Sequence, residues 1–391
     1  MGNLTRRDVL KMGAAGVVAG LGSAGCAEMH LGPGRAGAGA APVPLGPDEP
    51  LRTAFIGVGG RGSGLLNAFL KLKGQQVVAI CDITPDNLNR GIASVEKAQG
   101  KAPQGYGAGP DDFKRVLDRK DIHAVVTATP CFEHARMMLA AIQAGKHIYG
   151  EKPMALNVAD ADRIVAAAEA NRRLVVQVGF QWMCNPNFVD CIRRIHEGQI
   201  GEPVEGRFFR HNGYPPLKGW FEHREKSGDW MLEQACHEFN LMNWAAQTTP
   251  LQAYGMGRRD LFNAPANGIT NYYAAIIEYP KSFIVHYAQG WISPAGFHET
   301  GKKIIGTKGA TEIGGERIAV HDPDAKVEPL QKFKGDDTEE ALRCFVESIR
   351  EGKPARAPVS NGRNASLVAL MVRKAVDERR VVTWKEMLRS C

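Results

Sequence analysis

Long hydrophobic runs, cysteine motifs and internal repeats are all absent from this sequence of 391 residues. No apolar run reaches the roughly 20 residues that a membrane-spanning helix needs. The eight cysteines form no C-x-x-C pair and no Cys/His cluster with zinc spacing, so neither a disulfide framework nor a metal site is predicted. The hydrophobic content of 44% is typical of a globular chain, and the length suits two domains.

The net charge of +7 comes from bases that are scattered among acids, without aromatic–basic alternation. This pattern indicates a solvated basic surface and no nucleic-acid partner.

The amino terminus has the features of a targeting signal. Arg6 and Arg7 precede a weakly apolar stretch, which resembles a twin-arginine export signal and predicts a periplasmic or exported protein. The alternative is a short basic amphipathic helix. Cys26 ends a partial lipoprotein box in which Ser23 replaces the expected large aliphatic residue, so lipid anchoring is left open. Residues 32–47 are rich in Gly, Ala and Pro, which predicts a flexible tether. We exclude residues 1–50 from the fold.

A glycine-rich turn follows the first expected strand, residues 53–56, and opens a helix. In this turn Gly57 permits a tight bend, Gly59 lets the backbone approach a pyrophosphate, and Gly62 allows close packing of helix and strand. Asp82 ends the next strand, about 20 residues further on, where a carboxylate can accept both ribose hydroxyls. Its charge would repel a 2′-phosphate, which favours NAD over NADP; the alternative role of Asp82 is a cap.

Strands and helices then alternate up to residue 178, which predicts a parallel sheet with ligands at the carboxyl ends of its strands. Thr129-Pro130 and Glu151-Lys152-Pro153 fall at such ends. The second half instead reads as successive strands with short turns, including a hairpin at Pro280-Lys281.

Several segments together resemble the Gfo/Idh/MocA oxidoreductases, the family of glucose–fructose oxidoreductase and inositol dehydrogenase. The resemblance covers roughly residues 52–385 and rests on residues 55–62, 128–130, 134, 144–147, 151–153, 178–181, 185–186, 304–309 and 345–384. It implies an α/β fold: a Rossmann domain, residues 51–180, and an α/β domain with a large open, mainly antiparallel sheet, residues 181–391. The expected cofactor contacts are Gly57, Gly59, Gly60, Arg61, Gly62, Asp82, Thr129, Pro130, His134, Glu151 and Lys152.

Family members act mostly on sugars and cyclitols, so we expect a carbohydrate or cyclitol substrate and a tightly bound NAD. The resemblance and a set of aromatic strand residues also suggest a homo-oligomer, a dimer or tetramer, although a solvated sheet face is the alternative. These residues are Tyr272, Tyr273, Tyr287 and Trp291.

Three side chains are the candidates for proton transfer. Lys152 follows a buried strand at the cofactor edge, where desolvation and a nearby cation would lower its pKa; alternatively it only holds the cofactor. Glu233 and His237 are four residues apart, so one helix would bring them to one face. The family pattern there is Asp-x-Gly-x-His-x-x-Asp; Glu233 replaces the first Asp and His237 matches. A satisfied His and a solvated Glu are the alternative, and no third metal ligand is placed.

Substrate contacts are expected from aromatic rings and hydrogen-bonding side chains near the domain junction, with loop packing as the alternative. They are Gln181, Trp182, Asn185, His211, Tyr214 and Trp220.

The sequence therefore predicts an exported NAD-dependent oxidoreductase acting on a ring hydroxyl of a sugar, glycoside or cyclitol. The first alternative is a glycoside hydrolase or lyase that works by transient oxidation and elimination with recycled NAD. The second is a non-catalytic sugar-binding or cofactor-binding protein on the same scaffold.

Overall fold

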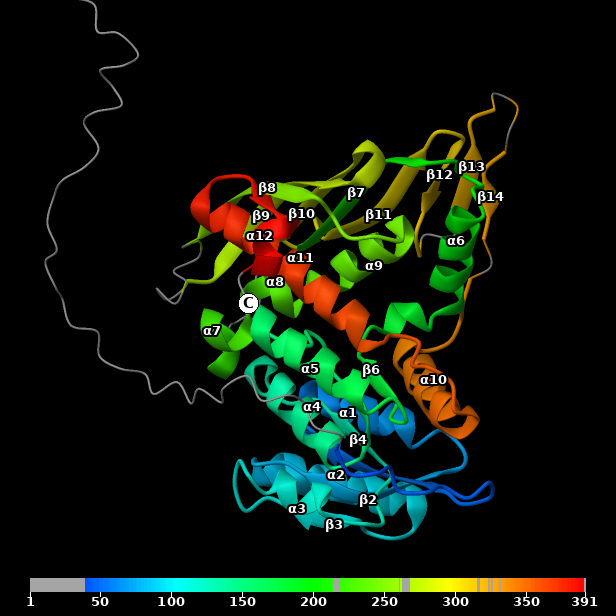
Figure 1. The fold of residues 1–391 in the computed structure, drawn as a ribbon, viewed down its shortest axis with the longest axis vertical. Helices are drawn as coiled ribbons and strands as arrows, with labels where there is room; N and C mark the ends of the chain where they lie inside the picture. Colours follow the sequence, from blue (N-terminus) through cyan, green and yellow to red (C-terminus); the bar gives the residue numbers. More distant parts are fainter. Residues whose placement is uncertain are drawn as a thin grey trace, which may run out of the picture. The chain divides into compact units, whose positions relative to one another are not determined.

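The computed structural model describes residues 39–213, 218–259, 261, 268–314, 317–322, 324, 326–330 and 332–389. The expected export signal and Cys26 lie outside these residues. Two sheets organise the described part of the chain (Figure 1). None of its helices combines the length and apolarity that crossing a membrane requires.

The first sheet has six parallel strands in the order β3-β2-β1-β4-β5-β6. Strand order reverses between β1 and β4, as in dinucleotide-binding sheets, and this confirms the predicted Rossmann arrangement. The strands are β1 Leu51–Ile56, β2 Gln75–Cys81, β3 Gln104–Tyr106, β4 Ala124–Thr127, β5 His147–Gly150 and β6 Val176–Val178.

The helices between these strands begin and end at residues that satisfy their free backbone groups. Asn157 starts α5 by accepting a hydrogen bond from the Asp160 amide at 2.8 Å, and Gly100 ends α2 in the left-handed conformation, with φ 72°. The helices are α1 Gly60–Phe69, α2 Pro85–Gln99, α3 Phe113–Leu117, α4 His134–Gln143 and α5 Val158–Ala170.

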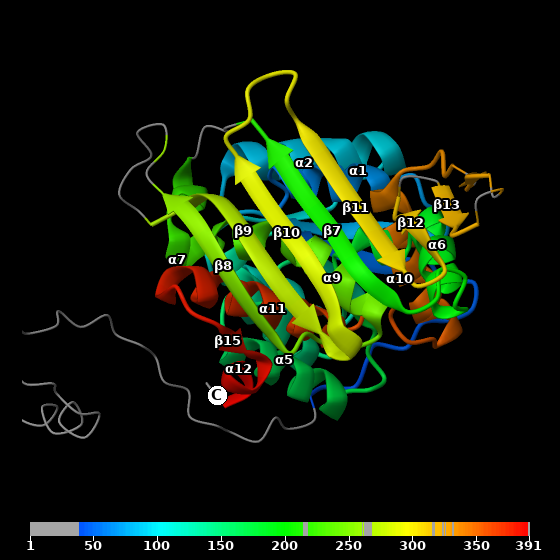
Figure 2. The ribbon, with the colours of Figure 1, turned by 90° about the horizontal axis from the view of Figure 1, so that it is seen from above.

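The second sheet has nine strands in the order β14-β13-β12-β11-β7-β10-β9-β8-β15 (Figure 2). Its neighbours are antiparallel except β7 and β10, a parallel pair that the sequence did not predict. The predicted hairpin at Pro280-Lys281 is confirmed between β9 and β10. The strands are β7 Pro203–Asn212, β8 Gln252–Arg259, β9 Thr270–Tyr279, β10 Phe283–Trp291, β11 Glu299–Gly306, β12 Gly309–Glu312, β13 Arg317–Val320, β14 Glu328–Pro329 and β15 Val382–Thr383.

Helices cover one face of the second sheet, here called the inner face, and leave the outer face open (Figure 2). Tyr287 packs its ring 4.9 Å from that of Phe239 on the inner face, and the Tyr273 hydroxyl donates to Asp229 there. The expectation that both tyrosines serve an oligomer face is therefore wrong. The helices of this half are α6 Pro186–His196, α7 Arg224–Ser227, α8 Asp229–Glu233, α9 Cys236–Ala246, α10 Asp337–Glu351, α11 Val359–Glu378 and α12 Trp384–Arg389.

Two segments pack against the first sheet although the sequence places them elsewhere. Helix α10 returns to it: the Phe345 ring lies 6.0 Å from that of Tyr149, and Gln177 donates to the Ala341 carbonyl at 2.9 Å. The segment that begins at residue 39 contacts the ends of α5 and α4, where the Gly39 amide donates to Asn171 at 2.7 Å and the Ala40 amide to the Gln143 carbonyl at 2.9 Å. The expected flexible tether therefore does not extend over the described residues 39–47.

Candidate active site

The glycine turn between β1 and α1 has the shape that a pyrophosphate requires. Gly57 has φ 81°, and a Cβ on it would lie 2.7 Å from the Ala128 carbonyl oxygen; a Cβ on Gly62 would lie 2.0 Å from the Gly57 oxygen. Above Gly59 the nearest atom to such a Cβ is Asn87 Nδ2, at 3.6 Å. The turn therefore needs two glycines for its own packing and keeps open space at the N-terminus of α1.

Asp82 at the end of β2 holds this turn from the other side. Its Oδ2 accepts the Val58 amide at 2.8 Å and its Oδ1 accepts the Thr84 amide at 2.8 Å. Asp82 therefore has the predicted capping role, since it accepts two backbone amides of neighbouring turns. A carboxylate offers about four acceptor positions, so contacts to ribose hydroxyls fit the same group and stay a prediction.

An ion pair ties the glycine turn to the end of β5. Arg61 Nε donates to Glu151 Oε1 at 2.7 Å, and Glu151 Oε2 accepts the Lys152 amide at 3.1 Å. Arg61 also donates to the Thr338 hydroxyl on α10, at 3.0 Å. This network fixes where the Lys152 backbone lies relative to the turn.

His134 has a positioning role in place of the expected direct contact with the cofactor. Its side chain is buried, and its ring nitrogens lie 2.7 Å from the Pro153 carbonyl and 2.8 Å from the Thr129 carbonyl. Burial lowers the pKa of this imidazole. His134 therefore holds the loops after β4 and β5, which carry Pro130 and Lys152, in register with each other.

Lys152 reaches across to α8. Its Nζ donates to Glu233 Oε1 at 2.8 Å and to the Glu233 carbonyl, and both side chains are 14% exposed. Burial lowers the pKa of the Lys152 ammonium, but the Glu233 carboxylate, together with Glu151 and nearby thiols, raises it, and the net pKa is above the ordinary value. The expected lowered pKa of Lys152 is therefore wrong for this ion pair, because that expectation considered burial and the cofactor charge but not the Glu233 carboxylate.

Glu233 and His237 do not share one helix, in contrast to the prediction. Helix α8 ends at Glu233, and α9 begins at Cys236. His237 nevertheless lies in the same cluster, with its ring 5.7 Å from that of Phe180 and 5.1 Å from that of Trp182. Burial, and then the charge of Lys152, lower the pKa of His237 well below its usual value. The imidazole is therefore neutral at ordinary pH.

Several buried polar atoms around this cluster have no hydrogen-bond partner among the described residues. Such atoms are uncommon in folded proteins, and each keeps capacity that a ligand can use. They are Gln181 Oε1, Trp230 Nε1, Glu233 Oε2, His237 Nδ1 and Glu238 Oε2.

Arg210 and Glu238 belong to this cluster and were missed by the sequence reasoning. They form an ion pair, and the Arg210 guanidinium lies 5.7 Å from the centroid of the Trp182 ring. The alternation of β7, which buries Phe208, was the signal that could have placed Arg210 on the inner face.

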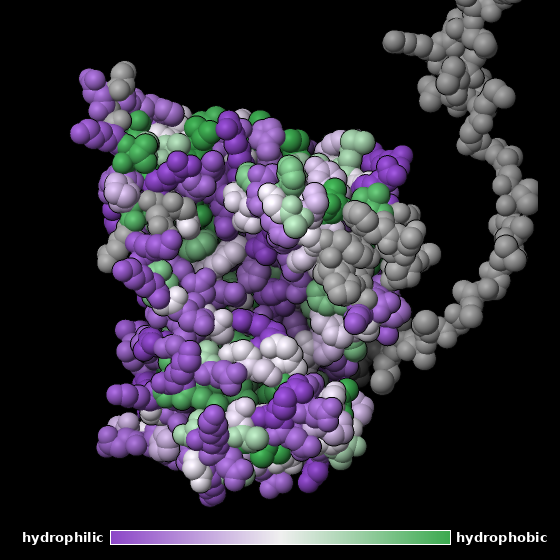
Figure 3. Space-filling view, turned by 180° about the vertical axis from the view of Figure 1, so that it is seen from behind, coloured by the Kyte–Doolittle hydropathy of each residue, from purple (hydrophilic) through white to green (hydrophobic). Residues whose placement is uncertain are grey.

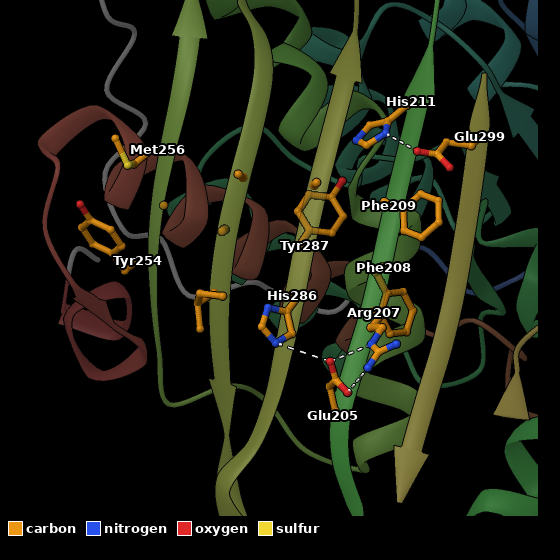
Figure 4. Close-up of a pocket in the computed structure, with 15 residues that line it drawn as sticks. Glu205, Arg207, Phe208, Phe209, His211, Tyr254, Met256, His286, Tyr287 and Glu299 are labelled. Carbon is orange, nitrogen blue, oxygen red and sulfur yellow. Dashed lines mark hydrogen bonds and ion pairs between the residues drawn. The ribbon is translucent and has the colours of Figure 1, made fainter. Parts of the chain in front are cut away.

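The other expected substrate contacts lie in different surroundings. Asn185 caps α6 by accepting the Asn187 amide at 2.8 Å and donates to Asp337. His211 lies on the outer face, near Glu299, in a shallow hollow of 690 Å³ (Figure 4). In contrast to the predicted substrate contacts, Asn185 therefore caps a helix, and His211 lies on the opposite face of the sheet from the Lys152–His237 cluster.

Trp220 lies in a short helical turn, Gly219–Glu222, and packs 4.7 Å from the Phe221 ring. Tyr214 is outside the described residues.

Hydrophilic side chains line a recess between the parts that hold the two sheets (Figure 3). Within the described ranges, no group of three or more His, Cys, Asp or Glu side chains could hold a metal ion.

Two family models match consecutive parts of the chain. Residues 51–180 match the oxidoreductase family with an NAD-binding Rossmann fold, and residues 188–312 match the GFO/IDH/MocA C-terminal domain. The two matches together span more than half of the chain, which therefore belongs to the Gfo/Idh/MocA oxidoreductase family. The predicted NAD-binding domain is confirmed.

Curated relatives include a Glycosyl hydrolase family 109 protein of Saccharopolyspora erythraea, 33% identical over 207 residues, which are 52% of this chain and 44% of the relative. An Inositol 2-dehydrogenase of Salmonella typhimurium is 29% identical over 197 residues, 50% of this chain and 54% of the relative. The chain thus spans about half the length of the curated relatives it matches.

Solved structures support the fold. The myo-inositol 2-dehydrogenase from Lactobacillus plantarum superimposes with a TM-score of 0.73 at 20% identity, over 86% of this chain and 99% of that chain. The aldose-aldose oxidoreductase from Caulobacter crescentus gives 0.74 at 18% identity, over 86% and 100%.

Proposed function

We propose that this protein is an NAD-dependent oxidoreductase that acts on a ring hydroxyl of a sugar, glycoside or cyclitol. The observation that carries the proposal is the 2.8 Å contact between Lys152 Nζ and Glu233 Oε1, beside the neutral imidazole of His237. Through Glu151 and Arg61, the Lys152 backbone is tied to the glycine turn of the NAD-binding fold. Proton-carrying groups thus lie at the carboxyl edge of the cofactor domain.

The open space above Gly59 and the carboxylate of Asp82 fit NAD, whose nicotinamide supplies hydride transfer when bound. Asp82, without a neighbouring cation at Ile83 or Thr84, favours NAD over NADP. Lys152 Nζ in its neutral form would accept the proton of the substrate hydroxyl, and Glu233 Oε1 would stabilise the ammonium that results. His237 offers the second proton site.

A redox-neutral glycosidase is the second candidate, and the relatives described as Glycosyl hydrolase family 109 proteins favour it. Transient oxidation of a ring hydroxyl acidifies a neighbouring C–H. Loss of that proton expels the glycosidic substituent, and water addition followed by re-reduction restores the sugar. Lys152 and His237 would handle the protons of both routes, and tightly bound NAD would be recycled within each turnover.

Purified protein distinguishes these functions. Its absorbance and fluorescence are scanned for bound NAD(H), and it is then incubated with sugars, cyclitols and aryl glycosides, with and without added NAD. Net NADH supports the dehydrogenase, whereas released aglycone without net NADH supports the glycosidase. Ligand binding without turnover of any substrate would leave only the non-catalytic binding protein.

The proposal includes export by the twin-arginine pathway, with Arg6 and Arg7 as its signal. Lipid attachment at Cys26 would place the exported chain in the membrane fraction. Cell fractionation of the full chain and of a variant with Arg6→Lys and Arg7→Lys is the measurement. Retention of the variant in the cytoplasm, with the unchanged chain exported, is expected; equal distribution of the two would contradict export by this route.

We also propose that the outer sheet face pairs with a second copy of the chain. Exposed apolar side chains gather on neighbouring strands there (Figure 4). They are Tyr254, Met256, Ile276 and Ile284, which are 41%, 64%, 44% and 40% exposed. Sedimentation should give a dimer or tetramer that Met256→Glu weakens; a monomeric unchanged protein would contradict this.

A further inference from the structure

Lys302 of β11 is a cation on the inner face of the second sheet, next to the catalytic cluster. In the sheet register it lies opposite Phe208, which is buried on that face. Its Nζ is 4.9 Å from the centroid of the Trp182 ring and 5.9 Å from that of Phe188. Since the Trp182 ring lies 5.1 Å from that of His237, Lys302 and His237 flank the same indole.

The other cations around His237 each have a carboxylate partner. Lys152 pairs with Glu233 at 2.8 Å, Arg61 pairs with Glu151 at 2.7 Å, and Arg210 pairs with Glu238. These ion pairs span the cofactor domain and the inner face of the sheet. Within the described ranges, the Lys302 ammonium has neither an ion pair nor a hydrogen bond, although the residue is only partly exposed.

The acids that face Lys302 are already engaged elsewhere. They are Glu238, which pairs with Arg210, and Asp337, which accepts the Asn185 side-chain amide at 2.6 Å. Glu312 lies opposite Lys303 on the other face of the sheet and pairs with Lys303 and Arg317. Their charges attract Lys302 from a distance, yet burial lowers the pKa of its ammonium overall. A largely desolvated cation without a direct partner is costly, and an anion supplied by a ligand would offset that cost.

We propose that Lys302 binds an anionic substituent, a carboxylate or a sulfate, of the sugar substrate. The inference rests on the proposed function and names its substrate class: acidic sugars or their glycosides. Phe188 stacks on the Trp182 ring at 5.2 Å, and the His237 ring lies 5.1 Å from it, so an anion held by Lys302 would lie close to the imidazole. Lys302 would thereby orient the reacting hydroxyl toward Lys152.

The test compares matched substrate pairs on the NAD-loaded full chain. The pairs are D-glucose and D-glucuronate, D-galactose and D-galacturonate, an aryl β-glucoside and an aryl β-glucuronide, and N-acetylglucosamine and its 6-sulfate. The last pair distinguishes sulfate from carboxylate. We expect at least about a tenfold higher kcat/KM for one class of acidic member than for its neutral counterpart. Lys302→Met should raise KM for that member at least about tenfold more than it changes KM for the neutral member.

Lys303→Met is the matched control, because Lys303 is the next residue of the same strand and points to the opposite face. It should behave as the unchanged protein, while Lys302→Arg should restore most of the acidic preference. Thermal unfolding of each variant checks that it is folded. Equal or better use of neutral members by the unchanged protein, or identical KM values for Lys302→Met and Lys303→Met, would overturn the inference.

The same experiment distinguishes failure of the inference about Lys302 from failure of the proposed function. If neutral sugars alone are turned over, the oxidoreductase stands and the role of Lys302 falls. If no compound reduces the bound cofactor or releases aglycone, the proposed function fails, and the inference falls with it.

Discussion

The cofactor side and the α8–α9 side of the site differ in how fully their polar groups are paired. On the cofactor side, both oxygens of Asp82 and Glu151 and both ring nitrogens of His134 have protein partners. On the α8–α9 side, Glu233 Oε2 and His237 Nδ1 have none among the described residues. One side is therefore held in place before any ligand binds, while the other keeps hydrogen-bonding capacity for a substrate.

This difference matches what the two ligands need. A dinucleotide requires the same backbone positions in every turnover, and preorganised groups lower the cost of binding it. A substrate must instead be held by groups that are free to exchange protons and hydrogen bonds as its hydroxyl reacts. The Lys152–Glu233 ion pair joins the two sides and is the point at which they can be separated by mutation.

The largest effect should come from Lys152→Met, which removes the proton-exchanging amine and leaves the glycine turn intact. General acid–base groups contribute about 10²–10⁴-fold, so kcat on the best substrate should fall by that factor. Steady-state kinetics measure the loss, and cofactor fluorescence checks that NAD still binds. Unchanged dehydrogenase and glycosidase activities in this variant would refute the assignment of Lys152.

Asp82→Ala tests the cofactor side. Loss of a charged hydrogen-bonding partner should weaken NAD binding roughly 10–100-fold and reduce the preference for NAD over NADP. Titrations of both dinucleotides, followed by fluorescence, measure the change, with the exposed Asp86→Ala as control. Equal affinities of Asp82→Ala and the control would show that Asp82 serves the turn alone.

Glu233→Gln tests the ion pair that joins the two sides. Removing the carboxylate leaves burial as the main effect on Lys152, so the pKa of Lys152 should fall and its neutral form should appear at lower pH. The limb of the kcat/KM profile that depends on neutral Lys152 should therefore shift to lower pH. Exposed Glu225→Gln is the control. A profile shift in the opposite direction would contradict the pairing.

The smallest effect concerns the stability of the first sheet. His147 Nδ1 accepts the Val175 amide at 2.9 Å, and burial lowers the pKa of His147 to about 4. Because the unfolded chain binds this proton more readily, stability is lost as pH falls from about 6.5 toward 4, by about 3 kcal/mol at most. His147→Asn retains an acceptor without the charge.

Urea unfolding across that pH window should show a flatter dependence for His147→Asn than for the unchanged protein. The control is His286→Asn at an exposed position of the outer face. If the two variants lose stability equally on acidification, the buried imidazole is not the cause.

The sequence predicted much of the cofactor side and less of the substrate side. Glycine spacing and strand–helix alternation are local signals, and they located Gly57, Gly62 and Asp82 correctly in the fold. The break between α8 and α9 and the return of α10 depend on packing between distant segments, which no local pattern encodes. Tyr272 and Tyr273 show a simpler error, since adjacent strand residues point to opposite faces.

The most direct test of the account is the reduction of bound nicotinamide in a single turnover. NAD-loaded protein is mixed with the panel of sugars, cyclitols and glycosides, and NADH absorbance is followed for the unchanged chain and for Lys152→Met. We expect rapid NADH formation with at least one ring-hydroxyl substrate, slowed about a hundredfold or more in the variant. Bound NAD that no such compound reduces, or equal rates in the two proteins, would contradict it.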